Sequence, residues 1–154
     1  MPLTPYHVGI ALLIGVLLYK YLDLYSILVG SVILDAWPFT VLFFSLPYRL
    51  HGISHSFIFG ILVAIIISLV RYKFNNFLKS KKNLKIILIS SFIGISSHIL
   101  LDSPLYKDMV PFWPSSFNHF YNLFSYSDII LFCIVSFILS GVIFIIKFRR
   151  KFYK

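Results

Sequence analysis

The sequence predicts an all-α integral membrane protein, a helical bundle with about five transmembrane helices in a single transmembrane domain, 1–154. Three observations support this prediction. Of the 154 residues, 59% are hydrophobic and only 12% are charged, whereas soluble proteins are nearer to half apolar and a quarter charged. A soluble domain of this size has too little interior to bury so many apolar side chains. The apolar residues also fall into long runs, and the basic residues are concentrated between them.

Each apolar run approaches the roughly 20 residues that a helix needs to cross the hydrocarbon core of a bilayer. The first run lacks a basic leader and a small-residue cleavage site, so we interpret it as a retained helix and not as a signal peptide. Pro38 lies inside the second run and is expected to kink or end the regular helix there. The expected spans are residues 6–22, 24–46, 52–72, 84–105 and 127–147.

The basic residues predict the orientation of the bundle, because Lys and Arg are enriched in cytoplasmic loops. Of the 14 basic residues, only Arg49 and Lys107 fall on the predicted outer side. The others are Lys20 and those in the loop 71–85 and the tail 147–154. We therefore expect the N-terminus outside, the C-terminus in the cytoplasm, and a multi-pass location in the plasma or inner membrane.

Charge and cysteine content exclude several classes of function. The net charge of +9 follows the membrane topology, so nucleic acid is not an expected partner and membrane lipids are; an oligomer is compatible with the sequence. The single Cys133 provides neither a disulfide framework nor a thiolate metal site. Segment 106–126 is aromatic and contains two prolines, which makes it too irregular for a span. We expect it to cover the outer end of the bundle as a lid, since aromatic rings favour the headgroup level.

Ionisable side chains converge near the predicted outer face. Intramembrane ionisable groups are costly and usually mark functional sites. The two pairs spaced i and i+4, His51 with His55 and His98 with Asp102, each share one helix face. The six candidate ligands come from four spans and lie at a similar depth: His7, Asp35, His51, His55, His98 and Asp102.

A divalent metal is the simplest compensation for burying these groups together. Imidazole and carboxylate ligands suit zinc, which we expect first, and also manganese or iron. The alternative is a packing network, in which His7 bonds a neighbouring helix and Asp35 or Asp102 pairs with Arg49 or Lys107. His119, in the outer segment, is interpreted as an interfacial residue. Asp128 is expected to cap the fifth span, and no Ser, His and Asp order indicates a catalytic triad.

Four blocks of the sequence resemble the YdjM-like family. They are "TPYHVGIALLIG", "VGSVILD", "HGISHSFIFG" and "SSHILLDSPLYKDMVPFWP", which together extend over most of the chain. The fourth block, HxxxD followed by PFWP, is the most specific, and the chain looks especially like archaeal members. Members are small inner-membrane proteins described as metal-dependent hydrolases. The resemblance implies a metal site at His7, Asp35, His55, His98 and Asp102.

The chain departs from the family pattern in two places. The family often has Pro-Asp-x-Asp in the second span, where this chain has "LDAWP" with the single Asp35. The family often has His-Arg-x-x-Thr-His-Ser before the third span, where this chain reads "LHGISHS". His51 is therefore one place closer to His55, and is either a shifted ligand or a residue with another role.

The expected function is that of a membrane-bound metal-dependent hydrolase near the outer leaflet, acting on an ester or phosphoester of a lipid or lipid-linked substrate. A carboxylate not needed by the metal, from Asp35 or Asp102, would be the catalytic general base. One alternative is metal binding or transport, although transporters usually have repeats and a midplane site. Another is a non-catalytic packing network. Resemblance to ceramidase-type intramembrane amidases is weaker, because those have more spans.

Overall fold

Six α-helices and one short 3₁₀ helix make up most of the chain that the structure describes, and no described residue belongs to a β-strand. The computed structural model describes residues 4–75, 77–78 and 80–152. Among the basic residues used above for orientation, Lys79 and Lys154 lie outside the described residues. The elements are α1 (Thr4–Leu17), α2 (Leu24–Ile33), α3 (Ala36–Phe43), η1 (Ile53–His55), α4 (Phe57–Lys73), α5 (Leu84–Asp102) and α6 (Tyr126–Phe152).

Three helical segments of the described chain are long and apolar enough to cross a membrane: Leu24–Phe43, Leu84–Asp102 and Tyr126–Lys147. α1 is a shorter apolar helix of 14 residues, and α4 has 17 residues. At about 1.5 Å per residue, α4 is about 26 Å long, against a hydrocarbon thickness of about 30 Å. The all-helical membrane fold predicted from the sequence is confirmed. The count of five spans and the orientation stay predictions.

The second predicted span is broken at its centre. α2 ends at Ile33 and α3 begins at Ala36, so Leu34 and Asp35 form a turn between them. In a continuous helix the Leu34 carbonyl would accept from residue 38, but Pro38 has no N–H and its ring would clash with that carbonyl. The N–H of Trp37 donates to the Leu34 carbonyl instead, at 3.2 Å. Pro38 thus interrupts the helix before its own position and leaves Asp35 at the break.

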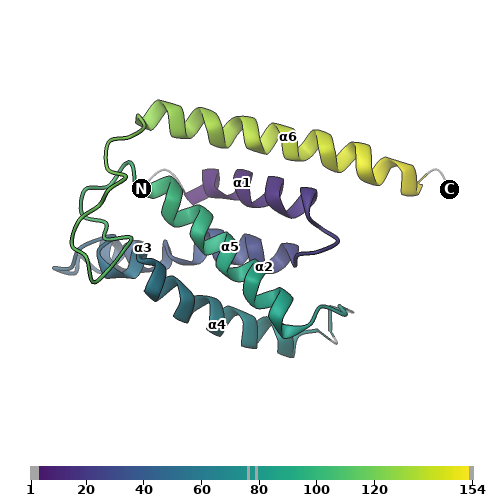
Figure 1. Ribbon diagram of the computed structural model, residues 1–154, viewed down its shortest axis with the longest axis horizontal. Helices are drawn as coiled ribbons and strands as arrows, with labels where there is room; N and C mark the ends of the chain where they lie inside the picture. The colour runs from purple at the N-terminus through teal and green to yellow at the C-terminus, as the bar shows by residue number, and fades with distance from the viewer. Residues whose placement is uncertain (1–3, 76, 79, 153–154) are drawn as a thin grey trace.

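The two ends of the bundle are built differently (Figure 1). The irregular segment between α5 and α6 lies at the same end as the start of α1 and the connection from α3 to α4. The N–H of Phe57 donates to the Pro111 carbonyl at 2.9 Å, and the Asn118 amide donates to the Ser103 carbonyl at 2.8 Å. Met109 is fully buried in the core that includes Ile95 and Ile99 of α5. The segment therefore covers this end of the bundle, as the sequence predicted.

α5 is the central helix and packs against α1, α2 and α4, whereas α6 packs on α1. Glycines allow the backbones of α2 and α5 to approach closely, as small residues do between membrane helices. A Cβ atom at Gly94 would overlap the Ile27 carbonyl, and one at Gly30 would lie 2.5 Å from the Ser91 carbonyl oxygen. This close crossing brings the polar backbone of α2 within reach of side chains on α5.

A buried ion pair joins three helices at the end of the bundle opposite the 103–125 segment. The Arg71 guanidinium of α4 donates from Nη2 to Asp23 Oδ1 at 3.2 Å, and its Nε lies 3.0 Å from Asp23 Oδ2. The Asp23 N–H donates to the Ser90 hydroxyl of α5 at 2.8 Å. The pair is buried, so removal of either partner would leave an uncompensated charge. It fixes the start of α2 against α4 and α5.

The close crossing of α2 and α5 generates a stability prediction. We expect Gly94→Ala to lower the free energy of unfolding by about 1–3 kcal/mol, because the added methyl group overlaps the Ile27 carbonyl and overpacking of this kind costs that much. Gly141→Ala on α6 is the matched control, since nothing lies within 4 Å of a Cβ there. Thermal unfolding of both variants in detergent measures the difference. Equal stability of the two variants would contradict the close crossing.

Candidate metal centre

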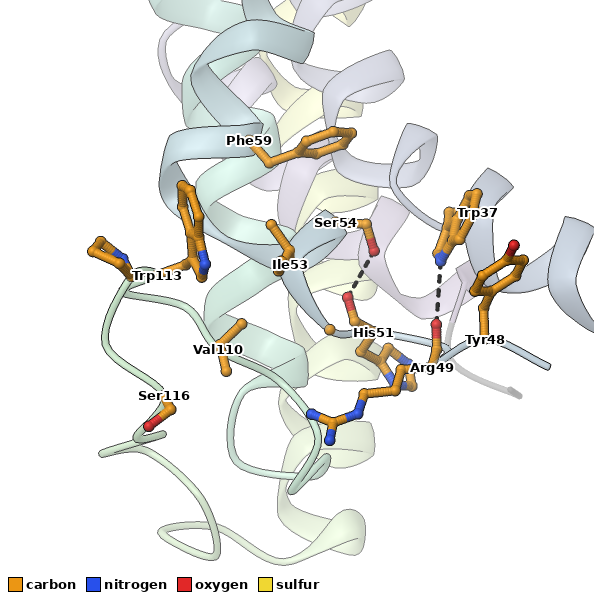
Figure 2. Close-up of a pocket in the computed structure, with 12 residues that line it drawn as sticks. Trp37, Tyr48, Arg49, His51, Ile53, Ser54, Phe59, Val110, Trp113 and Ser116 are labelled. Carbon is orange, nitrogen blue, oxygen red and sulfur yellow. Dashed lines mark hydrogen bonds between the residues drawn. The ribbon is translucent and has the colours of Figure 1, made fainter.

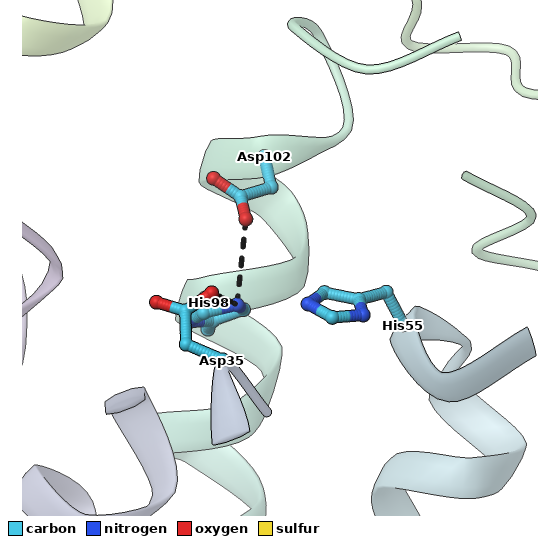
Figure 3. Close-up of side chains that lie close together, drawn as sticks. All are labelled: Asp35, His55, His98 and Asp102. Carbon is cyan, nitrogen blue, oxygen red and sulfur yellow. Dashed lines mark ion pairs between the residues drawn. The ribbon is translucent and has the colours of Figure 1, made fainter. Parts of the chain in front are cut away.

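Four buried side chains meet between three separate parts of the chain (Figure 3). They are Asp35, His55, His98 and Asp102, and each offers one nitrogen or oxygen atom, all within 4.8 Å of one another. All four residues are buried, from 0% exposed for His55 and His98 to 8% for Asp35. Two imidazoles and two carboxylates at this spacing form a donor set of the kind that divalent first-row metals bind.

Local breaks in helical structure place these side chains. Asp35 sits in the turn between α2 and α3, and His55 ends the short helix η1 that precedes α4. His98 and Asp102 occupy successive turns of α5, so the i, i+4 spacing puts both on one face. The His98 Nε2 atom lies 3.4 Å from Asp102 Oδ2 and 3.7 Å from Asp35 Oδ1. His98 is thus the centre of the cluster.

A backbone carbonyl fixes the tautomer of His98. Its Nδ1 atom lies 2.8 Å from the carbonyl oxygen of Ser31 on α2. A carbonyl oxygen can only accept, so Nδ1 must carry a proton and donate. In the neutral imidazole the lone pair is then on Nε2, which points at the carboxylates of Asp35 and Asp102. This arrangement is the one seen when a ligating histidine is held by a carbonyl behind it.

The same reasoning fixes the tautomer of His55. Its Nδ1 atom lies 3.0 Å from the Ser54 hydroxyl and 3.2 Å from the His51 carbonyl oxygen. The Ser54 hydroxyl donates to that His51 carbonyl at 2.7 Å, so its proton is committed elsewhere. The His55 Nδ1 atom is therefore the donor, and the Nε2 lone pair faces the cluster.

Several polar atoms of the cluster are buried without a hydrogen-bond partner. They are Nε2 of His55, Nε2 of His98, Oδ2 of Asp35 and Oδ1 of Asp102. Buried polar groups are normally satisfied, and an exception calls for a reason such as an ion. Lone pairs and carboxylates that face one another repel unless a proton or a cation lies between them. The donor set therefore fits a divalent cation.

His7, on α1, lies beside the four donors. Its Nε2 atom is 3.2 Å from Asp102 Oδ1, and its ring centroid is 4.1 Å from that of His98. The ring is buried, with 1% of the residue exposed. His7 contacts the second oxygen of Asp102, the one that does not face His98, and so it orients this carboxylate. Its assignment as a metal ligand stays a prediction.

His51 faces Asp108. Its Nδ1 atom is 3.3 Å from Asp108 Oδ1, and its backbone N–H donates to Oδ2 at 3.2 Å. The ring stacks on Tyr106, with 3.8 Å between centroids. Burial raises the pKa of Tyr106 to about 12, and the nearby carboxylates of Asp102 and Asp35 add to this effect. The structure thus places His51 in a supporting layer behind His55, and its role as a ligand stays a prediction.

Sequence reasoning missed Asp108, Ser54 and Ser31, which hold the histidines in place. Asp108 is 57 residues from His51 in the chain, so no spacing pattern could connect them. The Ser31 contact uses a backbone carbonyl, which any residue type supplies. Only Ser54, beside His55, could have been suggested by its position.

Other residues singled out in the sequence lie outside the cluster. His119 is exposed, and its ring lies near Phe117, with centroids 4.7 Å apart. Asp128 caps α6 as expected, because its carboxylate accepts from the N–H and the hydroxyl of Ser125 at 3.0 and 2.7 Å. Within the described chain Asp35 and Asp102 pair with histidines. Their expected alternative partners, Arg49 and Lys107, do not lie against them there.

The whole chain matches one family. The model of the YdjM inner membrane protein family aligns with residues 1–153. The chain belongs to this family. The resemblance inferred from the four sequence blocks is therefore confirmed, and with it the inner-membrane location. No curated protein and no solved structure matches the chain.

Most of the positions implied by the resemblance to the YdjM family lie together in the structure. Of the five positions that the resemblance implied, Asp35, His55, His98 and Asp102 converge, and His7 contacts Asp102. His51, where this chain departs from the YdjM pattern, is the candidate that faces away from the donors. The description of the family gives a location and no reaction, so the chemistry must be argued from the site.

The fixed tautomers can be tested by spectroscopy. In metal-free protein labelled with ¹⁵N at histidine, we expect His55 and His98 to carry a proton on Nδ1, because both atoms face backbone carbonyls. Ring ¹⁵N–¹H correlation spectra would measure this, with His55→Gln and His98→Gln used for assignment. The exposed His119 is the internal control and should average over both tautomers. An unprotonated Nδ1 in either buried histidine would show that the geometry is wrong.

Proposed function

We propose that this YdjM-family protein is a metal-dependent hydrolase of the membrane that acts on an ester or phosphoester. One divalent cation, zinc in the first instance and manganese or iron as alternatives, would be held by His55, His98 and Asp102, with Asp35 beside it and one position open for water. The observation that carries the proposal is the set of four buried residues that each offer a donor atom within 4.8 Å of the others, and that include polar atoms without hydrogen-bond partners.

The chemistry of the donors fits zinc. Zinc sites combine imidazole nitrogen with carboxylate oxygen, and their histidines donate the second ring N–H to a carbonyl or carboxylate. His98 and His55 meet this condition through the Ser31 and His51 carbonyls. A bound zinc ion supplies Lewis acidity and a water of lowered pKa near neutral pH, which is the basis of hydrolysis in such sites.

The two carboxylates would have different roles. Asp102 is 2% exposed and is engaged by His7 and His98. Asp35 is more accessible, with 11% of its side chain exposed, and its Oδ2 atom has no partner. Asp35 is therefore the better candidate for the general base, with Oδ2 accepting the proton that the attacking water releases. Asp102, oriented by His7, is the better candidate for a fixed ligand.

A packing network without metal makes a different demand. A proton would have to lie between His98 Nε2 and Asp35 or Asp102, since the Nδ1 proton of His98 already goes to Ser31. It would make either a buried carboxylic acid or a buried imidazolium, and the imidazolium would lie beside the rings of His7 and His55, with centroids 4.1 and 5.3 Å away. Burying an imidazolium against two other imidazoles is unfavourable. A divalent cation beside both carboxylates compensates them at once.

Transport of the ion is the weaker alternative. The buried residues between the cluster and the Asp23–Arg71 pair at the other end of the bundle include Ala64, Ser68, Ser91 and Ile95. These side chains are apolar or hydroxylic, and the described core holds no ionisable group at this level. A transport path would need ligands there. The position of the cluster near one end favours chemistry at a membrane surface.

The first test is the metal content of detergent-purified protein. We expect about one zinc, manganese or iron ion per chain, and complete loss of it in the double variant His98→Ala with Asp102→Ala, because two of the three proposed ligands are removed. Elemental analysis measures the content, and added zinc should also raise the thermal stability of the unmodified protein but not of the variant.

The matched control is His119→Ala with Asp128→Asn, which changes one imidazole and one carboxylate outside the cluster. This control should retain the metal. Stoichiometric metal in the His98 and Asp102 double variant would disprove the proposed centre. Absence of metal from the unmodified protein, even after reconstitution, would instead support the packing network.

A further inference from the structure

An apolar groove lies beside the candidate metal centre (Figure 2). It has a volume of about 640 Å³, which is within the usual range for small-molecule sites. In the view of Figure 2, Trp113 and Val110 lie on one side of the groove and Trp37 and Tyr48 on the other, with Phe59 at one end. The walls are mostly hydrocarbon and aromatic, and therefore suit an aliphatic chain.

The side chain of Arg49 lies at the end of this groove away from Phe59 (Figure 2). Arg49 is exposed, and its carbonyl oxygen accepts from the Trp37 indole N–H at 3.2 Å. No acidic residue of the described chain forms an ion pair with the Arg49 guanidinium. A guanidinium is a bidentate ligand for phosphate. The groove therefore combines an apolar slot with one uncompensated phosphate-binding group.

The groove and the metal centre share a wall. His51 and Ser54 line the groove, and the same two residues hold His55 Nδ1 through a carbonyl and a hydroxyl. The rings of His51 and His55 are 5.0 Å apart. A molecule bound in the groove would therefore lie one layer of residues away from the cluster.

We propose that this groove binds an anionic phospholipid, with the phosphate on Arg49 and an acyl chain between the aromatic walls. This names the substrate class for the hydrolase and, as a substrate assignment, rests on the proposed function; lipid binding itself does not. Trp and Tyr side chains favour the headgroup level of a bilayer, so the groove lies where phosphate and acyl chain meet. A lipid without a phosphate would leave Arg49 unpaired, the choline of phosphatidylcholine balances the charge of its own phosphate, and a free phosphate would leave the apolar walls unfilled.

The two tryptophans make the groove directly observable. The chain has two Trp residues, Trp37 and Trp113, and both line this groove. Bromine atoms on an acyl chain quench indole fluorescence on contact. The experiment uses the full-length protein in nanodiscs of unbrominated phosphatidylcholine, titrated with brominated phosphatidic acid or, separately, with brominated phosphatidylcholine. We expect brominated phosphatidic acid to reach half-maximal quenching at a mole fraction about fivefold lower, or lower still, than the mole fraction that brominated phosphatidylcholine requires.

Substitution of Arg49 should remove this preference. Arg49→Gln is expected to bring the two titrations together, and Arg49→Lys to retain part of the difference, because a point charge replaces a bidentate fork. Lys107→Gln is the matched control, since it removes the other basic residue of the predicted outer side, is exposed, and does not line the groove. Lys107→Gln should leave the preference unchanged.

Three results would overturn the proposal. One is equal quenching by both brominated lipids in the unmodified protein, which would mean ordinary contact with bulk lipid. Another is an equal loss of preference in Arg49→Gln and Lys107→Gln, which would indicate a diffuse surface charge. The third is full competition by glycerol phosphate alone, which would indicate a phosphate site without the lipid chain.

The readout needs no metal and no turnover, so it separates the two proposals. Preference for phosphatidic acid without bound metal would support the lipid groove and contradict the proposed hydrolase. Stoichiometric metal without a lipid preference would support the metal centre and contradict this substrate class. Circular dichroism of each Arg49 variant confirms that its helices are intact.

Discussion

The close contact between α2 and α5 is the constraint on which the rest of the molecule depends. Gly30 and Gly94 remove the side chains that would hold the two backbones apart, and the His98 ring then reaches the Ser31 carbonyl at 2.8 Å. This one contact sets the tautomer of the central histidine and aims its free nitrogen at the carboxylates. Without the close crossing, α5 would still present His98 and Asp102 on one face, but α2 would hold neither the ring nor Asp35 in place.

Charge is buried at both ends of the bundle, and the two ends resolve it differently. At one end the Arg71 guanidinium lies against both oxygens of Asp23, so a permanent cation compensates the carboxylate. At the other end the ion-pair partners of Asp35 and Asp102 among the described residues are histidines only. A pair of opposite permanent charges stabilises packing, whereas two carboxylates beside imidazoles are what a metal cation would compensate. This contrast within one molecule argues that the cluster is a site.

The irregular parts of the chain make the site possible. Regular transmembrane helices satisfy their backbone internally and tolerate irregular backbone only where protein covers it. Here the turn at Asp35 and the short helix that ends at His55 lie beneath the 103–125 segment, with Met109 inserted into the core. The same covering segment supplies Trp113 to the groove beside the site. The covering segment, the His and Asp cluster and the apolar groove therefore all lie at one end of the bundle.

The sequence alone determined the all-helical membrane fold, because long apolar runs leave little choice of solvent, and the i, i+4 pairing of His98 with Asp102, because helical spacing is local. It also brought His55 and Asp35 to the same end through topology. Only the tertiary structure decided that His51 faces Asp108, that His7 contacts Asp102, and that carbonyls of Ser31 and His51 fix the tautomers. Those contacts join residues far apart in the chain or use backbone atoms common to every residue, so no residue pattern encodes them.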